Sequence, residues 1–302
     1  MGYLDPNRQG LYRQVQTVAN LLNEGYYGWR YRGLTATTTL EGNTLVFAPD
    51  LNAGTVAIQY FFAKITSQTQ WAYDVGEQGL YLTYMRLFGD PFRNAVEPLV
   101  PSKLEQPTLS LPFAPGEIWY YTGGPHGGFA SGSAWAAVDF APPAPPDELI
   151  AQQGYCYISP FAVTAVADGV IARSGEGYVV LDLDGDGNEH TGWTIVYLHI
   201  SSQGVVPVGK RVHRGEALGH PSCEGGISNA THLHISRRYN GEWIPADCTS
   251  CPEDAQVPPF IMGEWRVFLT TGEYQGTMVH VKTGEVRQAE QGRENPINQL
   301  SY

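Results

Sequence analysis

Short β-prone runs separated by glycine and proline make up much of the second half of the chain. The runs AVTAVADGVIARSG, GYVVLDLD, GWTIVYLHIS, KRVHRGEALG and THLHISRRYNGEW follow one another between residues 162 and 243. Each reads as one strand, or as a strand with its turn. Their succession predicts a mostly antiparallel β domain. This region contains neither a glycine-rich nucleotide-binding loop nor a GxSxG nucleophile elbow.

The first hundred residues have helical periodicity instead. Apolar residues at helical spacing predict an amphipathic helix within residues 11–27. A second helix is predicted over 53–65, with Asn52 as its N-cap, and a third over 78–88, ended by Gly89. The residues of this part carry no chemistry that points to a reaction.

Two further stretches complete the organisation. A glutamate–glycine–asparagine turn between β-rich flanks predicts a hairpin between residues 34 and 49, and the proline-rich stretch 97–117 predicts a linker. We therefore expect an α+β protein. Its parts are a mainly helical accessory domain over 1–105, an antiparallel β domain over 106–270, and C-terminal strands with a frayed tail over 271–302.

The formal net charge of −12 argues against nucleic acid or an anionic membrane as the main partner, because both repel an acidic surface. The basic cluster at 210–214 is interpreted as a solvated turn. No apolar run approaches the roughly 20 residues that span a bilayer. The first residues lack a signal-peptide pattern, which predicts either a cytoplasmic protein or a mature form whose signal has been removed.

Four cysteines allow two disulfides in three pairings. Cys248 and Cys251 have the spacing of a zinc knuckle or a redox motif, but a knuckle needs a second close pair, which the sequence lacks. We therefore favour disulfides, formed among Cys156, Cys223, Cys248 and Cys251.

Five residues of the β domain form a constellation that suggests a metal site. His126 lies between glycines in GGPHGG, Asp139 follows the apolar run SAWAAV, and His199 ends the strand VYLHIS. In THLHIS, His232 and His234 are two positions apart, so their side chains point to the same face of a strand. Three histidine and carboxylate ligands with one position left for water describe a catalytic zinc site.

In such a site His126, Asp139 and His234 would supply the ligands. His199 and His232 would lie nearby without binding the metal. Two spare imidazoles beside a zinc ion suit peptide hydrolysis, because one can take a proton from water and the other can serve the oxyanion or the leaving amine. A histidine in a strand is more often structural, and that interpretation is the alternative for each residue taken singly.

The sequence resembles the lysostaphin and staphylolysin (LasA-like) family of zinc metallopeptidases, which cut peptide cross-links of bacterial peptidoglycan. The resemblance rests on PHGGFASGSAWAAVDF, on VYLHIS and on VPVGKRVHRGEALGHPSCEGGISNATHLHIS, and it covers roughly residues 109–265. The spacing between His126 and Asp139, and RRYNGEW after the paired histidines, are closer to the staphylolysin branch.

The resemblance implies one zinc ion per chain on His126, Asp139 and His234, with His199 and His232 as the pair that activates water and stabilises the transition state. It implies a secreted or cell-envelope hydrolase acting on peptidoglycan or a glycine-rich peptide, with glycyl bonds as the class that the branch favours. The alternative is a latent or inactive wall-binding or regulatory protein that keeps the fold and the zinc. From its place beside the active-site loop, Cys223 is expected to pair with Cys248 or Cys251.

Two weaker signals accompany this interpretation. Asp182, Asp184 and Asp186 resemble the start of an EF-hand calcium loop, but Trp193 stands at position twelve, where a bidentate glutamate belongs. An Asp- and Gly-rich hairpin turn explains the pattern equally well. Trp119 and Tyr121 suit a core, and they are also candidates to line a substrate groove beside the first histidine.

Overall fold

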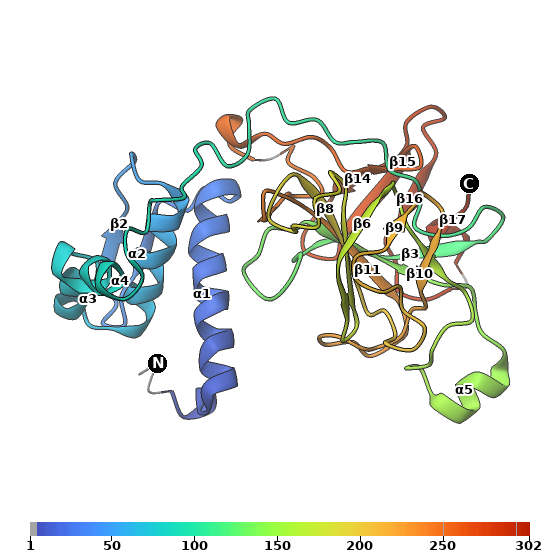
Figure 1. Ribbon diagram of the computed structural model, residues 1–302, viewed down its shortest axis with the longest axis horizontal. Coiled ribbons are helices and arrows are strands. Elements are labelled where there is room, and N and C mark those ends of the chain that lie inside the picture. Colours follow the sequence, from blue (N-terminus) through green and yellow to red (C-terminus); the bar gives the residue numbers. More distant parts are fainter. Residues whose placement is uncertain (1–4, 250, 294) are drawn as a thin grey trace. The chain divides into compact units, whose positions relative to one another are not determined.

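A computed structural model describes residues 5–249, 251–293 and 295–302. Its contacts divide the chain into two compact units, each of which is described by itself (Figure 1). The helical unit contains residues 1–102 together with the short segments 129–134 and 249–256, and the β unit contains the rest. The predicted α+β class, helical first and then mostly antiparallel β, is confirmed.

Helices α1 and α2 pack together in the helical unit. Gly25 of α1 allows close packing, because a Cβ atom there would lie 2.7 Å from the Cα atom of Ala57 on α2. Asn52 caps α2, its side-chain oxygen accepting the backbone N–H of Thr55 at 2.8 Å. The predicted helices and hairpin are present, and the elements are α1 (Leu11–Tyr31), β1 (Ala36–Thr38), β2 (Thr44–Val46), α2 (Ala53–Ile65), α3 (Gln68–Asp74), the π-helical turn η2 (Glu77–Tyr81) and α4 (Leu82–Phe88), after a 3-10 turn η1 (Pro6–Arg8).

The segment 129–134 belongs to the helical unit although it lies between two predicted metal ligands in the sequence. The Arg32 guanidinium, just after α1, donates hydrogen bonds to the backbone carbonyls of Gly132 and Ser133. A Cβ atom at Gly132 would lie 2.7 Å from the backbone nitrogen of Glu24, so this glycine allows the segment to approach α1 closely.

The main sheet of the β unit has nine antiparallel strands, with β12 paired to β11 beside the order β17-β3-β4-β11-β8-β7-β6-β9. Its strands are β3 (Trp119–His126), β4 (Ala137–Ala141), β6 (Gly169–Gly175), β7 (Tyr178–Asp182), β8 (Trp193–Leu198), β9 (Arg211–Val212), β11 (Leu233–Tyr239), β12 (Glu242–Trp243) and β17 (Gln299–Leu300). The candidate site is built on the central strands β3, β4, β11 and β8.

Smaller elements surround this sheet. A two-stranded sheet pairs β5 (Val163–Thr164) with β10 (Ala217–Gly219), and a four-stranded sheet contains β13 (Ile261–Met262), β14 (Trp265–Leu269), β15 (Gly276–His280) and β16 (Val286–Gln288). A short helix, α5 (Asp147–Gln153), and the 3-10 turns η3 (Glu253–Ala255) and η4 (Pro296–Asn298) complete the chain.

The C-terminal segment is ordered into the β unit. Leu300 on β17 pairs with Trp119 on β3 and is buried. The contacts group residues 257–302 with the β unit, whereas the sequence pattern set 271–302 apart with a frayed tail. The second half of the proline-rich stretch also packs into this core, where Leu111 and Phe113 are fully buried.

The two faces of the main sheet differ in chemistry. Leu233 and Ile235 of β11 point into the apolar core together with Val138 and Phe140 of β4. The alternate positions, such as His234 and Asp139, are on the opposite face. One side of the sheet therefore supplies the core, and the other is free to carry polar groups.

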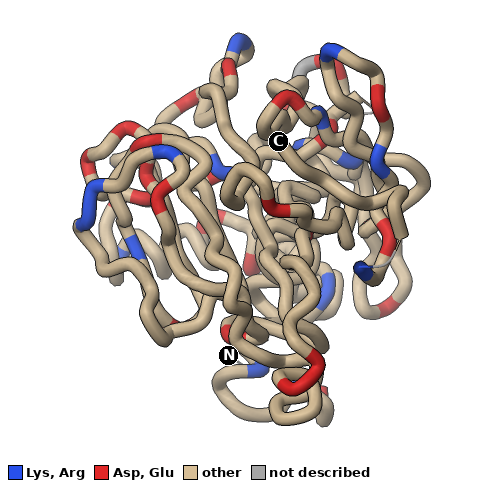
Figure 2. Tube along the Cα trace, turned by 90° about the vertical axis from the view of Figure 1, so that its right-hand side faces the viewer, with Lys and Arg blue, Asp and Glu red and all other residues tan. Residues whose placement is uncertain are grey.

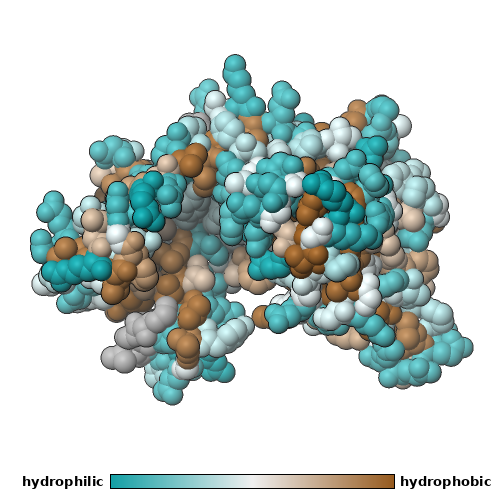
Figure 3. All heavy atoms as spheres, viewed as in Figure 1, coloured by the Kyte–Doolittle hydropathy of each residue, from teal (hydrophilic) through white to brown (hydrophobic). Residues whose placement is uncertain are grey.

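Acidic and basic residues are interspersed along the trace, with acidic ones more frequent, as the net charge of −12 requires (Figure 2). Exposed apolar side chains are common in the helical unit, including Leu87, Phe88 and Phe92, and brown side chains are visible there in Figure 3. Within the described ranges, every helix is either too short or too polar to cross a bilayer.

Candidate metal centre

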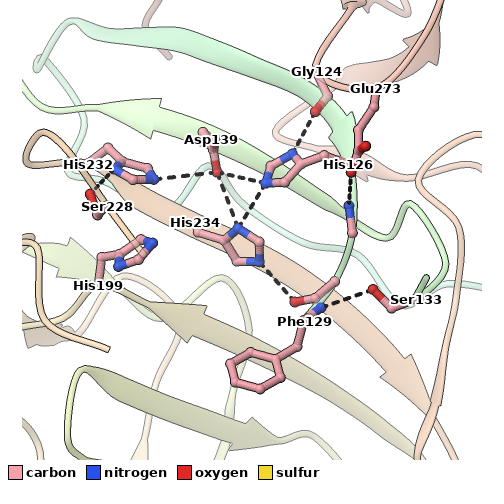
Figure 4. Close-up of polar contacts among 12 residues, drawn as sticks. Gly124, His126, Phe129, Ser133, Asp139, His199, Ser228, His232, His234 and Glu273 are labelled. Carbon is pink, nitrogen blue, oxygen red and sulfur yellow. Dashed lines mark hydrogen bonds and ion pairs between the residues drawn. The ribbon is translucent and has the colours of Figure 1, made fainter. Parts of the chain in front are cut away.

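The three predicted metal ligands lie on one face of the main sheet. His234 on β11 pairs directly with Asp139 on β4, and His126 at the end of β3 pairs with Ala137. Paired residues of antiparallel strands point to the same face, and Ala137 and Asp139 are two positions apart, so all three side chains share that face. Their ligand atoms lie within 4.8 Å of one another, and the three residues are buried (Figure 4).

His126 reaches this face because β3 is irregular. The register of β3 against β4 shifts between Tyr121 and Gly123 and again between Gly123 and His126. In a regular strand, residues three positions apart point to opposite faces. Here Gly123 pairs with Asp139 and His126 pairs with Ala137, so both pair with residues of the site face. The irregularity re-aims the histidine, as bulges do next to active sites.

Gly123 leaves the space that the Asp139 carboxylate occupies. A Cβ atom at this position would lie 2.5 Å from Oδ2 of Asp139 and 3.0 Å from its Cγ. Any larger residue would displace the carboxylate from the two histidines.

Backbone carbonyls determine which nitrogen of each ligand histidine is free. Nδ1 of His126 lies 2.8 Å from the carbonyl oxygen of Gly124, and Nε2 of His234 lies 3.0 Å from that of Gly128. A carbonyl oxygen only accepts hydrogen bonds, so these two nitrogens donate. The other two nitrogens, Nε2 of His126 and Nδ1 of His234, therefore present lone pairs toward the site.

The free atoms converge closely. Nε2 of His126 and Nδ1 of His234 are 2.9 Å apart, and Oδ1 of Asp139 lies 3.2 Å and 3.3 Å from them. Two lone pairs and a carboxylate oxygen repel one another at these distances unless a cation lies among them. Burial works against the charged form of Asp139, but its interactions with the neighbouring histidines, above all His126, outweigh burial and hold the pKa of Asp139 well below its usual range.

The residues fit a bound zinc ion. With zinc–ligand bonds of about 2.0–2.1 Å, the ligand atoms of a tetrahedral site lie about 3.3 Å apart. The three observed separations, 2.9, 3.2 and 3.3 Å, are close to that value. Two histidines and one carboxylate are a donor set that zinc accepts, with a fourth position left open.

His199 lies beside this group because of an unusual backbone conformation. It follows β8 directly and has a φ of +65°, in the left-handed region that few residues other than glycine adopt. Its ring lies 4.5 Å, centroid to centroid, from that of His232 and 6.2 Å from that of His234. Burial, and then the charges of His232 and His234, lower the pKa of His199 to about 3, so this imidazole is neutral at neutral pH.

His232 lies next to His199 at the edge of the group (Figure 4). Its Nε2 lies 3.8 Å from Oδ1 of Asp139, and its Nδ1 donates to the carbonyl oxygen of Ala230 at 2.8 Å. His199 is held in the same way, since its Nδ1 donates to the carbonyl oxygen of Glu224 at 3.0 Å. Each ring of this flanking pair, His199 and His232, therefore keeps Nε2 free to accept a proton.

The sequence interpretation missed two residues of the neighbourhood. Tyr274, in the turn between β14 and β15, stacks on His126 with ring centroids 4.2 Å apart and 21° between the ring planes. Glu273 accepts the backbone N–H of Gly127 at 3.4 Å. This turn follows the paired histidines by some forty residues, and no periodicity in its sequence links it to the site.

Two family models match the chain. LasA, N-terminal domain, matches residues 1–101, and Peptidase family M23 matches residues 156–245. Protease LasA of Pseudomonas aeruginosa strain PAO1 is 26% identical over 257 residues, which are 78% of this chain and 56% of that protein. Protease LasA of strain UCBPP-PA14 is 25% identical over 256 residues with the same coverage. These matches support a LasA-like protein of the M23 peptidase family.

The resemblance drawn from the sequence is thereby confirmed. The M23 match includes His199, His232 and His234, whereas His126 and Asp139 precede it. The helical region, which the sequence interpretation left without a relative, matches the LasA N-terminal model. The chain spans about half the length of the curated LasA proteins that it matches.

Two solved structures are also similar to parts of the chain. The M23 metalloprotease pseudoalterin from the deep sea is 22% identical with a TM-score of 0.46, over 61% of this chain and 96% of that chain. The catalytic domain of the antimicrobial peptidase lysostaphin from Staphylococcus simulans is 25% identical with a TM-score of 0.29, over 42% of this chain and 86% of that chain.

The structure of the β unit does not support the groove prediction for Trp119 and Tyr121. Both side chains are fully buried. Trp119 stacks on Phe113 with ring centroids 5.1 Å apart, and Tyr121 packs beside Phe140. They alternate on β3 toward the core, so neither lines a surface beside His126.

The predicted pairing of Cys223 with Cys248 or Cys251 is wrong. Cys223 is bonded to Cys156, 67 residues earlier, with Cα atoms 5.4 Å apart. Cys248 and Cys251 are also disulfide-bonded. The preference for disulfides was therefore right, and only the partners differ.

Asp182, Asp184 and Asp186 come together in the hairpin between β7 and β8, with one ligand oxygen of each within 4.8 Å of the others. Their carboxylates accept backbone N–H groups of this hairpin. Asp182 accepts those of Asp184 and Gly187, and Asp186 accepts that of Asn188. The bonds from Asp184 to Asp182 and from Asn188 to Asp186 have the two-residue spacing of Asx turns, in agreement with the hairpin interpretation.

Proposed function

We propose that this M23 protein is a zinc-dependent endopeptidase of peptidoglycan cross-links, with His126, Asp139 and His234 as the metal ligands. The single observation that carries the proposal is the convergence of two lone-pair nitrogens and one carboxylate oxygen at 2.9 to 3.3 Å. Family membership supports a peptidase. The latent or wall-binding alternative is not favoured, since all five expected residues are present and gathered together.

When bound, zinc supplies Lewis-acid chemistry, polarising the scissile carbonyl and making water acidic enough to be a nucleophile near neutral pH. Nδ1 of His199 donates to the carbonyl oxygen of Glu224, so its free Nε2 is the atom that would accept a proton from the nucleophilic water. His232, next to His199, is the group that would pass a proton to the leaving nitrogen. The carbonyls that bind the two Nδ1–H groups keep both rings in the required tautomer.

Peptidoglycan enters as the substrate class because the sequence motifs resemble the lysostaphin and staphylolysin family and because the chain matches the M23 family model and Protease LasA. Glycyl bonds are the proposed preference within this class. The disulfides suit an oxidising compartment, which supports a secreted or cell-envelope location.

The test combines metal analysis with clearing of purified peptidoglycan, with and without a chelator. We expect one zinc ion per chain, clearing that stops with the chelator, and recovery when zinc is restored. A matched variant is His220→Ala, which removes a half-buried histidine that donates to the carbonyl of Phe161 and is outside the metal group. This variant should keep both zinc and clearing.

Two results would contradict the proposal. Absence of zinc after reconstitution would show that the three residues are not a zinc site. Stoichiometric zinc without clearing of peptidoglycan would show that the protein lacks the proposed activity. Cleavage of glycine-containing peptides, compared with cross-links of D-amino acids, then measures the proposed glycyl preference.

A further inference from the structure

A short segment, Ser222–Glu224, contacts His199 from two sides. The backbone N–H of Ser222 donates to the carbonyl oxygen of His199 at 2.7 Å. On the other side, Nδ1–H of His199 donates to the carbonyl oxygen of Glu224 at 3.0 Å. The segment therefore binds both the main chain and the ring of this histidine.

The carboxylate of Glu224 binds the turn that follows His199. Its Oε1 accepts the hydroxyl of Ser201 at 3.0 Å, and its Oε2 accepts the backbone N–H and the hydroxyl of Ser202 at 2.8 and 2.5 Å. Burial opposes ionisation, but the hydrogen bonds from Ser202 and Ser201 outweigh it and lower the pKa of Glu224. One residue thus holds the His199 ring through its backbone and the next turn through its side chain.

The segment is itself anchored. Cys223 carries the disulfide to Cys156, and Ser222 forms a β-bridge with His232. The hydroxyl of Ser222 also accepts the backbone N–H of Glu224 at 3.0 Å. A change in this segment would therefore move the partner carbonyl of His199 relative to the sheet.

His199 needs such support because its own strand does not provide it. A non-glycine residue in the left-handed region costs of order 1 kcal/mol or more, and it persists only where the surroundings hold it. In the absence of these contacts, continuation of β8 would turn the ring of the residue after Leu198 toward the opposite face. His199 has a φ of +65°, and hydrogen bonds hold the main chain at this residue and at Ser202 after it. These bonds keep the His199 ring beside the metal group.

We propose that Glu224 is a positioning residue for His199: its carboxylate holds the Ser201–Ser202 turn, and its carbonyl oxygen sets the tautomer and direction of the ring. The inference rests on the proposed function, because it assigns a means of orienting the proposed base. Outer partners that orient a functional histidine typically contribute about 10- to 100-fold to activity when replaced.

The experiment measures kcat, KM and zinc content of the full chain carrying Glu224→Ala, Glu224→Gln, His199→Ala and the double variant. We expect Glu224→Ala to lower kcat about tenfold or more with KM and zinc unchanged. Glu224→Gln should recover much of that loss, since its amide oxygen can still accept from Ser202. In the His199→Ala background, Glu224→Ala should have no further effect on kcat, because the ring that it positions is gone.

Glu216→Ala is the matched control. Its carboxylate also binds a turn, accepting from the backbone N–H of His213 and pairing with Lys210, but it contacts no residue of the metal centre. This variant should leave kcat unchanged. The comparison distinguishes the effect of losing any glutamate that binds a turn from the specific effect of losing Glu224.

The outcomes separate the two proposals. A large loss in His199→Ala together with wild-type kcat in Glu224→Ala and Glu224→Gln would overturn the positioning role alone. Equal further losses from Glu224→Ala with and without His199 would overturn it too, because that pattern is a general structural effect. Full activity of His199→Ala, or no cleavage by the unaltered chain, would overturn the proposed function and the inference with it.

Discussion

His126, Asp139 and His234 are held by three adjacent strands, whereas His199 and His232 are held by segments outside regular strands. The first group is positioned by the pairing of β3, β4 and β11. His199 of the flanking pair has a left-handed backbone conformation. The rings of the pair are held by the carbonyl oxygens of residues 224 and 230, and residue 224 follows a cysteine that is anchored by a disulfide. The proposed ligands thus depend on the sheet, and the proposed proton carriers depend on loops. Substitutions in the strands should therefore cause loss of the metal, whereas substitutions in the loops should lower activity and leave the metal bound.

Removing a proposed ligand should have the largest effect. Asp139→Asn or His234→Ala should reduce bound zinc to background and lower activity by about a thousandfold or more, because metal chemistry supplies several kcal/mol of transition-state stabilisation. Metal analysis after dialysis and clearing assays measure both. Zinc retained at one per chain would assign the metal to other residues, and His220→Ala serves as the control.

Removing one of the flanking pair should cost less and leave the metal in place. His199→Ala and His232→Ala should each lower turnover by about a hundredfold or more, as loss of a general acid or base does. Zinc content should stay at the level of the unaltered chain. Loss of zinc in these variants would erase the distinction between the two regions.

Breaking the disulfide should loosen the loop region while leaving the strands paired. Cys156→Ser with Cys223→Ser should lower the free energy of unfolding by about 2–4 kcal/mol and lower kcat several-fold, since the carbonyl that orients His199 is one residue from Cys223. Denaturant unfolding and steady-state kinetics measure the two effects. Replacing Cys248 and Cys251 instead should leave kcat unchanged. Equal kinetic losses in both double variants would show that the effect is not local.

The effect expected to be smallest close to neutral pH is a pH dependence of stability. The pKa of His199 is about 3 in the folded protein and about 6.5 in an unfolded chain, so between these values only the unfolded state takes up this proton. As pH falls below 6.5, metal-free protein should lose up to about 1.4 kcal/mol of stability per pH unit through this group. His199→Gln should unfold with a shallower pH slope. Identical slopes would mean that His199 is not buried in its neutral form.

Residue spacing predicts those parts of the molecule that follow a regular period. Asn52 was predicted as the cap of α2 and accepts the expected backbone N–H. His232 and His234 were predicted to share a face because they are two positions apart, and both lie beside Asp139. These inferences need only the repeat of a helix or strand.

Departures from regular geometry explain the remainder. The direction of the His126 side chain depends on two register shifts in β3, and the direction of the His199 side chain depends on a positive φ. Neither direction can be predicted from the regular alternation of side chains along a strand. Trp119 and Tyr121 alternate correctly, but alternation does not say which side of β3 is the core. Tyr274 reaches His126 through pairing of distant strands, so no local pattern indicates it.

The direct pairing of His234 with Asp139 also bears on how the chain reaches its native state. A slip of β11 by one residue would turn every side chain of the strand to the other face, placing Ile235 where the histidine belongs. Such a misfolded chain would turn Leu233 and Ile235 away from the core, and it would lack one imidazole of the three-ligand group. Metal binding would therefore stabilise only the chains in which β11 and β4 are paired in the native register.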